Sequence, residues 1–212
     1  EITERDWSSD VCSSDLTLKT ADEYYCNLKL LVENSNLNLL ELNSLVISSV
    51  VPDLTTIFTQ LADKYLKCRI INVSGYTDIG LTFPVSDPGF IGADLNVNAF
   101  AAWKKYNDNC IVLDLGTATT IQLIGKDGYF FGTAIIPGIM IAAGSLFSKA
   151  SLLSNIKFSA TDILLGTNTK DALLAGIITG NTLMLDAFIK KLKSKYGYLQ
   201  TFKTIATGGI AG

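Results

Sequence analysis

The sequence contains no histidine in its 212 residues, and this absence excludes several classes of catalytic site. Ser-His-Asp and Cys-His relays, histidine-rich zinc sites and general-base catalysis by imidazole all need that side chain. The four cysteines are widely spaced and form no C-x-x-C pair, which excludes a zinc knuckle and a thioredoxin-like motif. Any catalysis therefore depends on carboxylates, hydroxyls, lysines or bound cations.

The sequence also lacks an excess of positive charge. Seventeen Lys and Arg residues against twenty Asp and Glu residues give a net charge of −3 and a pI near 4.9, which offers no basic surface to nucleic acid. Widely spaced cysteines without a pairing motif are typical of proteins in a reducing compartment, so we expect a cytoplasmic protein.

Membrane segments are not expected either. The uncharged window at 128–148 contains four glycines and Pro137, and it has the pattern of a strand followed by a break rather than of a spanning helix. The first residues contain no basic region leading into an apolar stretch, so the sequence does not predict a signal peptide.

The first sixteen residues, EITERDWSSDVCSSDL, have neither helical nor strand periodicity. They repeat Ser-Ser-Asp at 8–10 and 13–15, and they resemble the translated read-through of a sequencing adaptor. We therefore expect residues 1–16 to be a non-native leader and derive the fold from the remaining chain.

From residue 17 onward the periodicity predicts helices and strands in alternation. Thr20 and Glu23 fit a capping box, and the β-branched run at 45–51 ends at Pro52. Helices are expected at about 20–33, 54–65, 90–106, 138–150 and from 170 onward. Strands are expected at 45–51, 68–73, 110–115, 119–124, 129–136 and from 202 onward, with 125–128 as a hairpin turn. This order predicts an α/β fold with mixed sheets.

The string DLGTATT at 114–120 follows a buried strand and is the most informative motif. Its glycine lets backbone N–H groups approach phosphate oxygens, its threonine hydroxyls add donors, and its acid can hold a cation against a triphosphate. The alternative is a strand that ends in an ordinary turn, where Asp and Gly are also common.

A second candidate is Gly92-Ala93-Asp94, at the start of the helix expected at 90–106, with Asn98 one turn further on. As a general base, Asp94 would take a proton from a substrate hydroxyl, a role that contributes about 10²–10⁴-fold in rate. The alternative is a first-turn acid that only stabilises the helix N-terminus.

Two further strings are GTNT at 166–169 and ATGG at 206–209. The first precedes the long helix, and Thr169 is expected to be its N-cap. The second follows the last strand. Taken singly, each is equally well explained as a cap or a tight turn.

Together, these strings resemble in order and spacing the type III pantothenate kinase family of the acetate and sugar kinase, heat-shock ATPase and actin superfamily. The resemblance covers most of the chain and is carried by SSVVP at 48–52, GAD at 92–94, DLGTATT at 114–120, IIPG at 135–138, GTNT at 166–169 and ATGG at 206–209. It implies two ribonuclease H-like (actin-like ATPase) domains with mixed sheets, expected at 17–108 and 109–212, the first incomplete and the second lacking its end.

The resemblance implies ATP-dependent phosphorylation of the pantothenate hydroxyl, the first step of coenzyme A biosynthesis, in a homodimer that uses Mg²⁺ and a monovalent cation (K⁺ or NH₄⁺). By position, Asp94 matches the catalytic proton acceptor and Asp114 the acid associated with the monovalent cation. The residues matched to substrate binding are Gly92, Ala93, Asp94, Asn98 and Thr169; those matched to the nucleotide are Gly116, Thr117, Gly208 and Gly209. Phosphoryl transfer depends on positioning and charge neutralisation, so a chain without histidine can perform it.

The sequence departs from the family pattern in several places, of which three bear on the site. No residue in 1–47 matches the Asp-x-Gly-Asn-Thr phosphate loop with which the family opens, so we expect a fragment of low or no activity. Leu95 replaces the arginine of the GADR pattern that is expected to meet the pantothenate carboxylate, and Gln122 replaces an acid. Loss of such a charge-assisted contact removes roughly 1.5–3 kcal/mol of binding energy.

These departures leave two alternatives open. One is a non-catalytic nucleotide-binding or regulatory homologue that has lost pantothenate recognition. The other is a related kinase of the same superfamily that acts on another small hydroxylated substrate.

Overall fold

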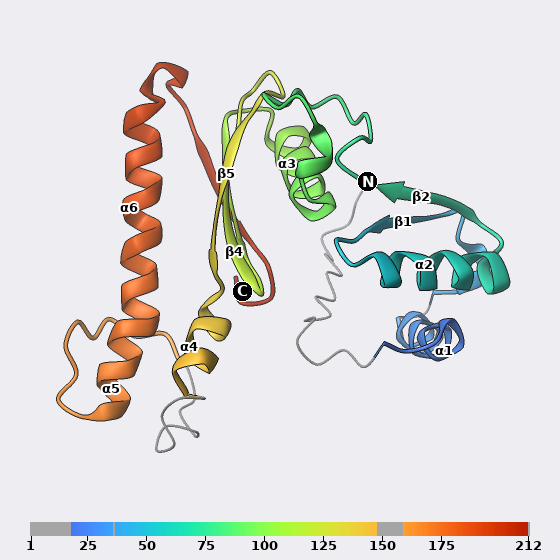
Figure 1. Cartoon of the computed structure of the whole chain (residues 1–212), viewed down its shortest axis with the longest axis horizontal. Coiled ribbons are helices and arrows are strands. Elements are labelled where there is room, and N and C mark those ends of the chain that lie inside the picture. Colours follow the sequence, from blue (N-terminus) through green and yellow to red (C-terminus); the bar gives the residue numbers. More distant parts are fainter. Residues whose placement is uncertain (1–17, 36, 148–158, 212) are drawn as a thin grey trace. The chain divides into compact units, whose positions relative to one another are not determined.

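A computed structural model describes residues 18–35, 37–147 and 159–211 (Figure 1). The described residues form two units, an N-terminal unit up to Ala101 and a C-terminal unit from Ala102 onward, and the boundary falls inside helix α3 (Ala93–Tyr106). Both units combine helices with a sheet, so the predicted mixed α/β class is confirmed. Residues 1–16, predicted to be a leader, lie outside the described residues.

The N-terminal unit is built from helices α1 (Ala21–Glu33) and α2 (Pro52–Leu61), the first part of α3 and a pair of parallel strands. Helices α1 and α2 pack on each other, and β1 (Ser44–Ser48) pairs in parallel with β2 (Arg69–Val73). Their core consists of Tyr24, Leu39, Leu61, Ala62 and Leu66. A π-helical turn at Ala62–Leu66 extends α2 to the end of its predicted range.

Strand β1 ends earlier than the sequence predicted. The expected strand continued to Val51, but the Ser49 hydroxyl accepts a hydrogen bond from the Val51 N–H at 3.0 Å. This local turn replaces strand pairing after Ser48. The β-branched residues that follow therefore lead directly into α2, which begins at Pro52.

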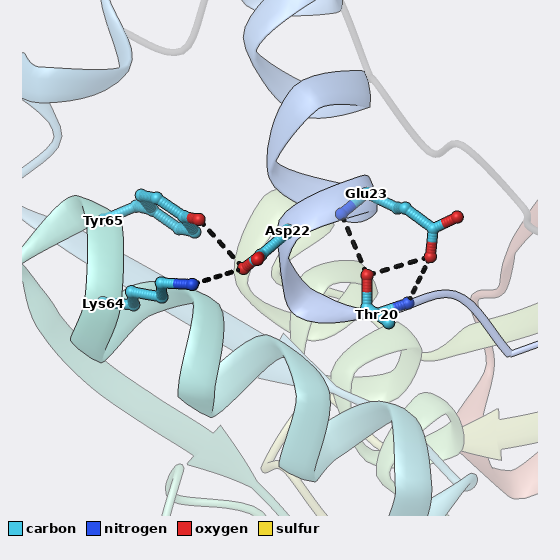
Figure 2. A network of polar contacts seen from close by, with 5 residues as sticks. All are labelled: Thr20, Asp22, Glu23, Lys64 and Tyr65. Atoms are coloured by element: carbon cyan, nitrogen blue, oxygen red, sulfur yellow. Dashed lines mark hydrogen bonds and ion pairs between the residues drawn. The ribbon is translucent and has the colours of Figure 1, made fainter.

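Helix α1 begins at the capping box that the sequence predicted (Figure 2). The Thr20 hydroxyl accepts from the Glu23 N–H at 3.3 Å, and the Thr20 N–H donates to the Glu23 carboxylate at 2.8 Å. One residue before Glu23, Asp22 accepts from Lys64 Nζ at 2.8 Å and from the Tyr65 hydroxyl at 2.9 Å. The lysine and tyrosine lower the pKa of Asp22, and the Thr20 backbone lowers that of Glu23. Their stabilising contribution is thus present above the ordinary carboxylate pKa and is lost as the pH falls through the lowered values.

Replacing Thr20 with alanine should destabilise the N-terminal unit by about 1 kcal/mol, because the Glu23 backbone N–H at the start of α1 loses its hydroxyl acceptor. Thermal unfolding measures this as a lower Tm. Thr56→Ala is a matched control, since it removes an exposed hydroxyl that bonds only within its own helix. An equal loss in both variants would contradict the capping role.

The C-terminal unit contains a four-stranded mixed sheet. Its strands are β3 (Cys110–Leu115), β4 (Ala118–Ile124), β5 (Phe130–Pro137) and β6 (Lys203–Thr207), in the order β5-β4-β3-β6. The hairpin predicted from the sequence is confirmed, because β4 pairs antiparallel with both β3 and β5. Strand β6 lies parallel to β3, so the carboxyl ends of these two strands meet at one edge.

One face of this sheet is covered by the long C-terminal helical segment. Helix α5 (Thr169–Leu174), a π-helical turn (Ala175–Thr179) and α6 (Gly180–Lys195) follow one another without a break (Figure 1). Leu185, Ile189 and Leu192 of α6 pack against buried residues of β3 and β4. The prediction that Thr169 caps this helix was wrong: the Asn168 side chain accepts from the Asp171 N–H at 2.9 Å and is the N-cap.

The uncharged window at 128–148 does not form a continuous helix. It is divided between β5 and α4 (Ile139–Phe147), with the break at Pro137-Gly138 as predicted, while residues 148–150 of the expected helix lie outside the described residues. A different segment, Thr169–Lys195, is long and apolar enough to cross a membrane by length and composition, with a mean hydropathy of 1.6 in an 18-residue window. One face of that segment packs on the sheet of the C-terminal unit.

The cysteines that the structure describes are free thiols. Cys110 is buried at the start of β3, and burial raises the pKa of its thiol to about 11. It therefore stays protonated at neutral pH and acts as a small core residue.

Candidate active site

The carboxyl edge of β3 and β6 brings Asp114 against the glycines of the last motif. Asp114 pairs with Thr207 across the two strands, and Gly208 follows with a φ of 97°. A Cβ atom on Gly208 would lie 2.7 Å from the Asp114 carboxylate and 2.7 Å from the Leu115 backbone nitrogen. Only glycine fits this close approach, so two motifs that are distant in the sequence form one edge.

Gly138 brings a third motif to the same edge. Its N–H donates to the Thr117 carbonyl at 3.0 Å, and a Cβ at this position would lie 2.3 Å from the Gly116 carbonyl oxygen. The turn at 116–117 is therefore held between Asp114 on one side and Gly138 on the other. Gly138 is part of the sequence motif IIPG, but it is not among the site residues predicted from the sequence.

This edge can bind anions and cations together. Thr117 is exposed, Gly116 and Asp114 are half-buried, and Gly209 is exposed beyond β6. A backbone turn with a hydroxyl fits phosphate oxygens, and an adjacent carboxylate fits a cation. Within the described ranges, no group of three or more Cys, Asp or Glu residues forms a multi-carboxylate metal cluster.

The other threonines of DLGTATT do not reach this turn. Thr119 and Thr120 lie inside β4, and their hydroxyls are buried without a hydrogen-bond partner in the described part of the chain. The expectation that the threonine hydroxyls of this motif face a ligand is therefore wrong for Thr119 and Thr120, because alternation along the strand directs them to the two buried faces. For Thr117 it stays a prediction.

Asp94 lies in the N-terminal unit, in the first turn of α3. It is exposed, whereas its neighbours Ala93 and Leu95 are buried. Its carboxylate accepts from the Leu95 N–H at 2.8 Å, as a first-turn acid does. A Cβ on Gly92 would lie 2.5 Å from this carboxylate and 3.3 Å from the Val50 side chain. Gly92 therefore lets the loop that follows β1 approach Asp94.

A buried asparagine anchors the same turn to the second strand. The Asn96 amide is fully buried and donates to the carbonyl of Ser74, the residue after β2, at 2.9 Å. Helix α3 thus begins at the carboxyl ends of both parallel strands. No sequence motif points to Asn96, whose only signal is that a polar residue stands two positions after Asp94. Asn98 is half-buried one turn along the helix.

Thr169 lies at the start of α5, beside a shallow hollow of about 510 Å³. The hollow is lined by Gly166, Thr167, Asn168, Thr169, Ala172 and Leu173. In the C-terminal unit the structure therefore brings Asp114, Gly116, Thr117 and Gly208 together and places Thr169 in a separate hollow.

Residues 3–191 match a family model described as type III pantothenate kinase. The chain belongs to this family. Curated relatives named type III pantothenate kinase include one from Thermomicrobium roseum, 37% identical and covering 90% of this chain and 73% of the relative. Another, from Kosmotoga olearia, is 38% identical and covers 91% and 72%; a third, from Bacillus cytotoxicus, is 35% identical and covers 91% and 73%.

Leu95 follows Asp94, at the position where the family resemblance implies an arginine. Its side chain is only 7% exposed, between the exposed Asp94 and the buried Asn96. An arginine at this buried position would have to extend its guanidinium group past Asp94 and Asn96. The substitution therefore replaces a charged group beside the candidate base with an apolar one.

Gln122 is the other departure from the pantothenate kinase pattern. It is fully buried in β4, and the strand register places it on the same face as Thr120 and Asp114. Neither atom of its side-chain amide has a hydrogen-bond partner among the described residues. A carboxylate buried in this way would cost far more than a neutral amide, so glutamine keeps a polar group here without burying a charge.

Proposed function

We propose that the protein catalyses ATP-dependent phosphorylation of pantothenate to 4'-phosphopantothenate. The observation that carries the proposal is the convergence of Asp114, Gly116, Thr117 and Gly208 at one sheet edge, in a chain of the type III pantothenate kinase family. The replacements at Leu95 and Gln122 suggested a non-catalytic homologue as an alternative. The relatives are named as kinases, which favours a kinase over that alternative.

Asp94 is the proposed general base of the reaction. Its exposed carboxylate would accept the proton of the pantothenate hydroxyl as that oxygen attacks the γ-phosphorus of ATP. Gly92, Ala93 and Asn98 would position the substrate beside it, and Thr169 would contact pantothenate from the hollow at the start of α5.

The edge beside Asp114 fits the phosphates of a nucleotide, because its backbone turn carries no bulky side chain and a carboxylate lies next to it. Gly116 and Thr117 would contact phosphate oxygens, and Gly208 and Gly209 would form part of the nucleotide wall. Asp114 would hold the monovalent cation, K⁺ or NH₄⁺. When bound, this cation and Mg²⁺ neutralise charge on the triphosphate.

The finer architecture is also part of the proposal. We propose two actin-like domains with the boundary at 108/109, seven residues after the division between the two compact units, together with a cytoplasmic location and a homodimer. The parallel pairing of β3 with β6 beside an antiparallel hairpin supports the C-terminal domain assignment.

The decisive experiment incubates the purified chain with ATP, Mg²⁺ and K⁺ and measures 4'-phosphopantothenate by mass spectrometry. Formation of this product from pantothenate, with none from glycerol or glucose offered as alternative acceptors, supports the proposal. Phosphorylation of another acceptor in preference to pantothenate would favour the related-kinase alternative. ATP binding without turnover of any acceptor would fit both the non-catalytic homologue and the low activity expected of a kinase without a matching Asp-x-Gly-Asn-Thr loop.

Leu95→Arg should lower the KM for pantothenate about 10-fold. This is the lower end of the gain from a charge-assisted contact, because the arginine must be accommodated at a buried position. Pantothenyl alcohol, which lacks the carboxylate, is the control substrate and should show no gain. An unchanged KM for pantothenate would indicate that another residue compensates for Leu95.

A further inference from the structure

The loop that leads into the GTNT motif is tied to the π-helical turn between α5 and α6. Thr179, the last residue of that turn, is buried, with 9% of its surface exposed. Its hydroxyl donates to the Ile163 carbonyl at 2.9 Å, and the Thr161 carbonyl lies 3.5 Å away. A buried hydroxyl therefore fixes a loop sixteen residues upstream.

The same loop is held at two further points. The Ile163 N–H donates to the Thr161 hydroxyl at 3.2 Å, which closes a local turn where Thr179 binds. A Cβ on Gly166 would lie 2.0 Å from the Ala172 backbone nitrogen, so the chain at 166 passes directly against the first turn of α5. Between these points Leu164 and Leu165 are exposed and contribute no buried packing, so the Thr179 bond carries much of the restraint.

We infer that Thr179 is a positioning residue for pantothenate binding, acting through the loop at 161–166 on the hollow that contains Thr169. Thr179 itself does not line the hollow. Its hydroxyl fixes the backbone that enters Gly166 and Thr167, two residues that do line it. The inference rests on the proposed function, because it assumes that pantothenate occupies this hollow.

The π-helical turn is consistent with such a role. A π turn inserts an extra residue into a helix and costs stability, and such turns are frequent near functional sites. Here the turn buries Ala175, Ile177 and Thr179, and it places a hydroxyl rather than an apolar side chain against the loop. If α5 continued as a regular α-helix, these three side chains would point in different directions around the helix axis.

The test compares Thr179→Val, which keeps the shape and removes the hydroxyl, with Thr179→Ser, which restores it. Thr179→Val should raise both the Kd and the KM for pantothenate by about 3- to 10-fold, the typical effect of one hydrogen bond, with kcat and the KM for ATP unchanged. Thr179→Ser should return the Kd and the KM to within about 2-fold of the original values.

Thr182→Val is the matched control. Thr182 lies three residues further along, and its exposed hydroxyl bonds to the Ile178 carbonyl within the same helix. It should leave pantothenate binding unchanged. Amide hydrogen exchange should become faster at 161–168 in Thr179→Val but not in Thr182→Val.

The outcomes separate the inference from the proposed function. If the unmodified chain does not bind pantothenate by calorimetry, the proposed function and the inference both fail. If it binds pantothenate and Thr179→Val binds it equally well, the inference alone fails. Equal weakening by Thr179→Val and Thr182→Val, or a loss in kcat alone, would also overturn it, because either result reflects general helix stability rather than positioning.

Discussion

Asp94→Asn is expected to lower kcat about 10²–10⁴-fold while leaving the fold intact. The amide keeps an oxygen that can accept from the Leu95 N–H, so the first turn of α3 is preserved. It cannot accept the proton of the pantothenate hydroxyl, and this is the loss that general-base catalysis predicts. Steady-state kinetics with ATP and pantothenate measure the effect, and the KM for ATP should change little.

Asp53→Asn provides the control for this substitution. Asp53 is an exposed acid in the first turn of α2, in the same unit, so the variant makes the same chemical change at an equivalent helical position. It should retain full kcat. If Asp94→Asn also retains full kcat, Asp94 is only a first-turn acid and the base lies elsewhere.

Asn109→Ala is expected to destabilise the C-terminal unit by about 2–4 kcal/mol. The Asn109 side chain is 6% exposed and makes three hydrogen bonds. Its amide nitrogen donates to the Leu199 carbonyl at 3.1 Å and to the Thr201 carbonyl at 3.0 Å, and its oxygen accepts from the Lys126 N–H at 2.9 Å. Removing the side chain leaves three backbone groups without these partners, at about 1 kcal/mol each or more.

Urea unfolding followed by the fluorescence of Trp103, in a W7F background, measures this loss. Trp103 reports on the right unit because its indole N–H donates to the Lys126 carbonyl at 2.9 Å. Asn27→Ala, at an exposed position on α1, should change stability by less than about 0.5 kcal/mol. Similar midpoints for Asn109→Ala and the unmodified protein would show that solvent replaces these bonds at no cost.

Elements with strong local signals were predicted from the sequence, but their contacts were not. The apolar run at 110–115 and the Asp-Gly turn at 125–128 defined β3 and the hairpin, because burial and turn chemistry are both local. Asn109 was not singled out, although it joins the start of β3, the hairpin turn and the segment before β6. The local sequence around a polar residue beside a strand does not indicate which distant carbonyl groups it will bind.

The errors at element ends have a common physical cause. Thr169 and Asn168 are both good N-caps, and only the geometry of the loop decides that Asn168 reaches the Asp171 N–H. The two π-helical turns gave no periodic signal either. Among the candidate site residues, the sequence suggested which residue types could bind phosphate. The contact of Gly208 with Asp114 depends on the register of β6 against β3, which no local pattern specifies.

The position of α3 has a practical consequence for dissecting the protein. One continuous helix carries Asp94 near its first residue and, beyond Ala101, residues that belong with the sheet of the C-terminal unit, such as Trp103. A gene cut at any codon of 93–106 would divide that helix between two polypeptides. Separate expression of either half should therefore use overlapping fragments that each encode the whole of α3.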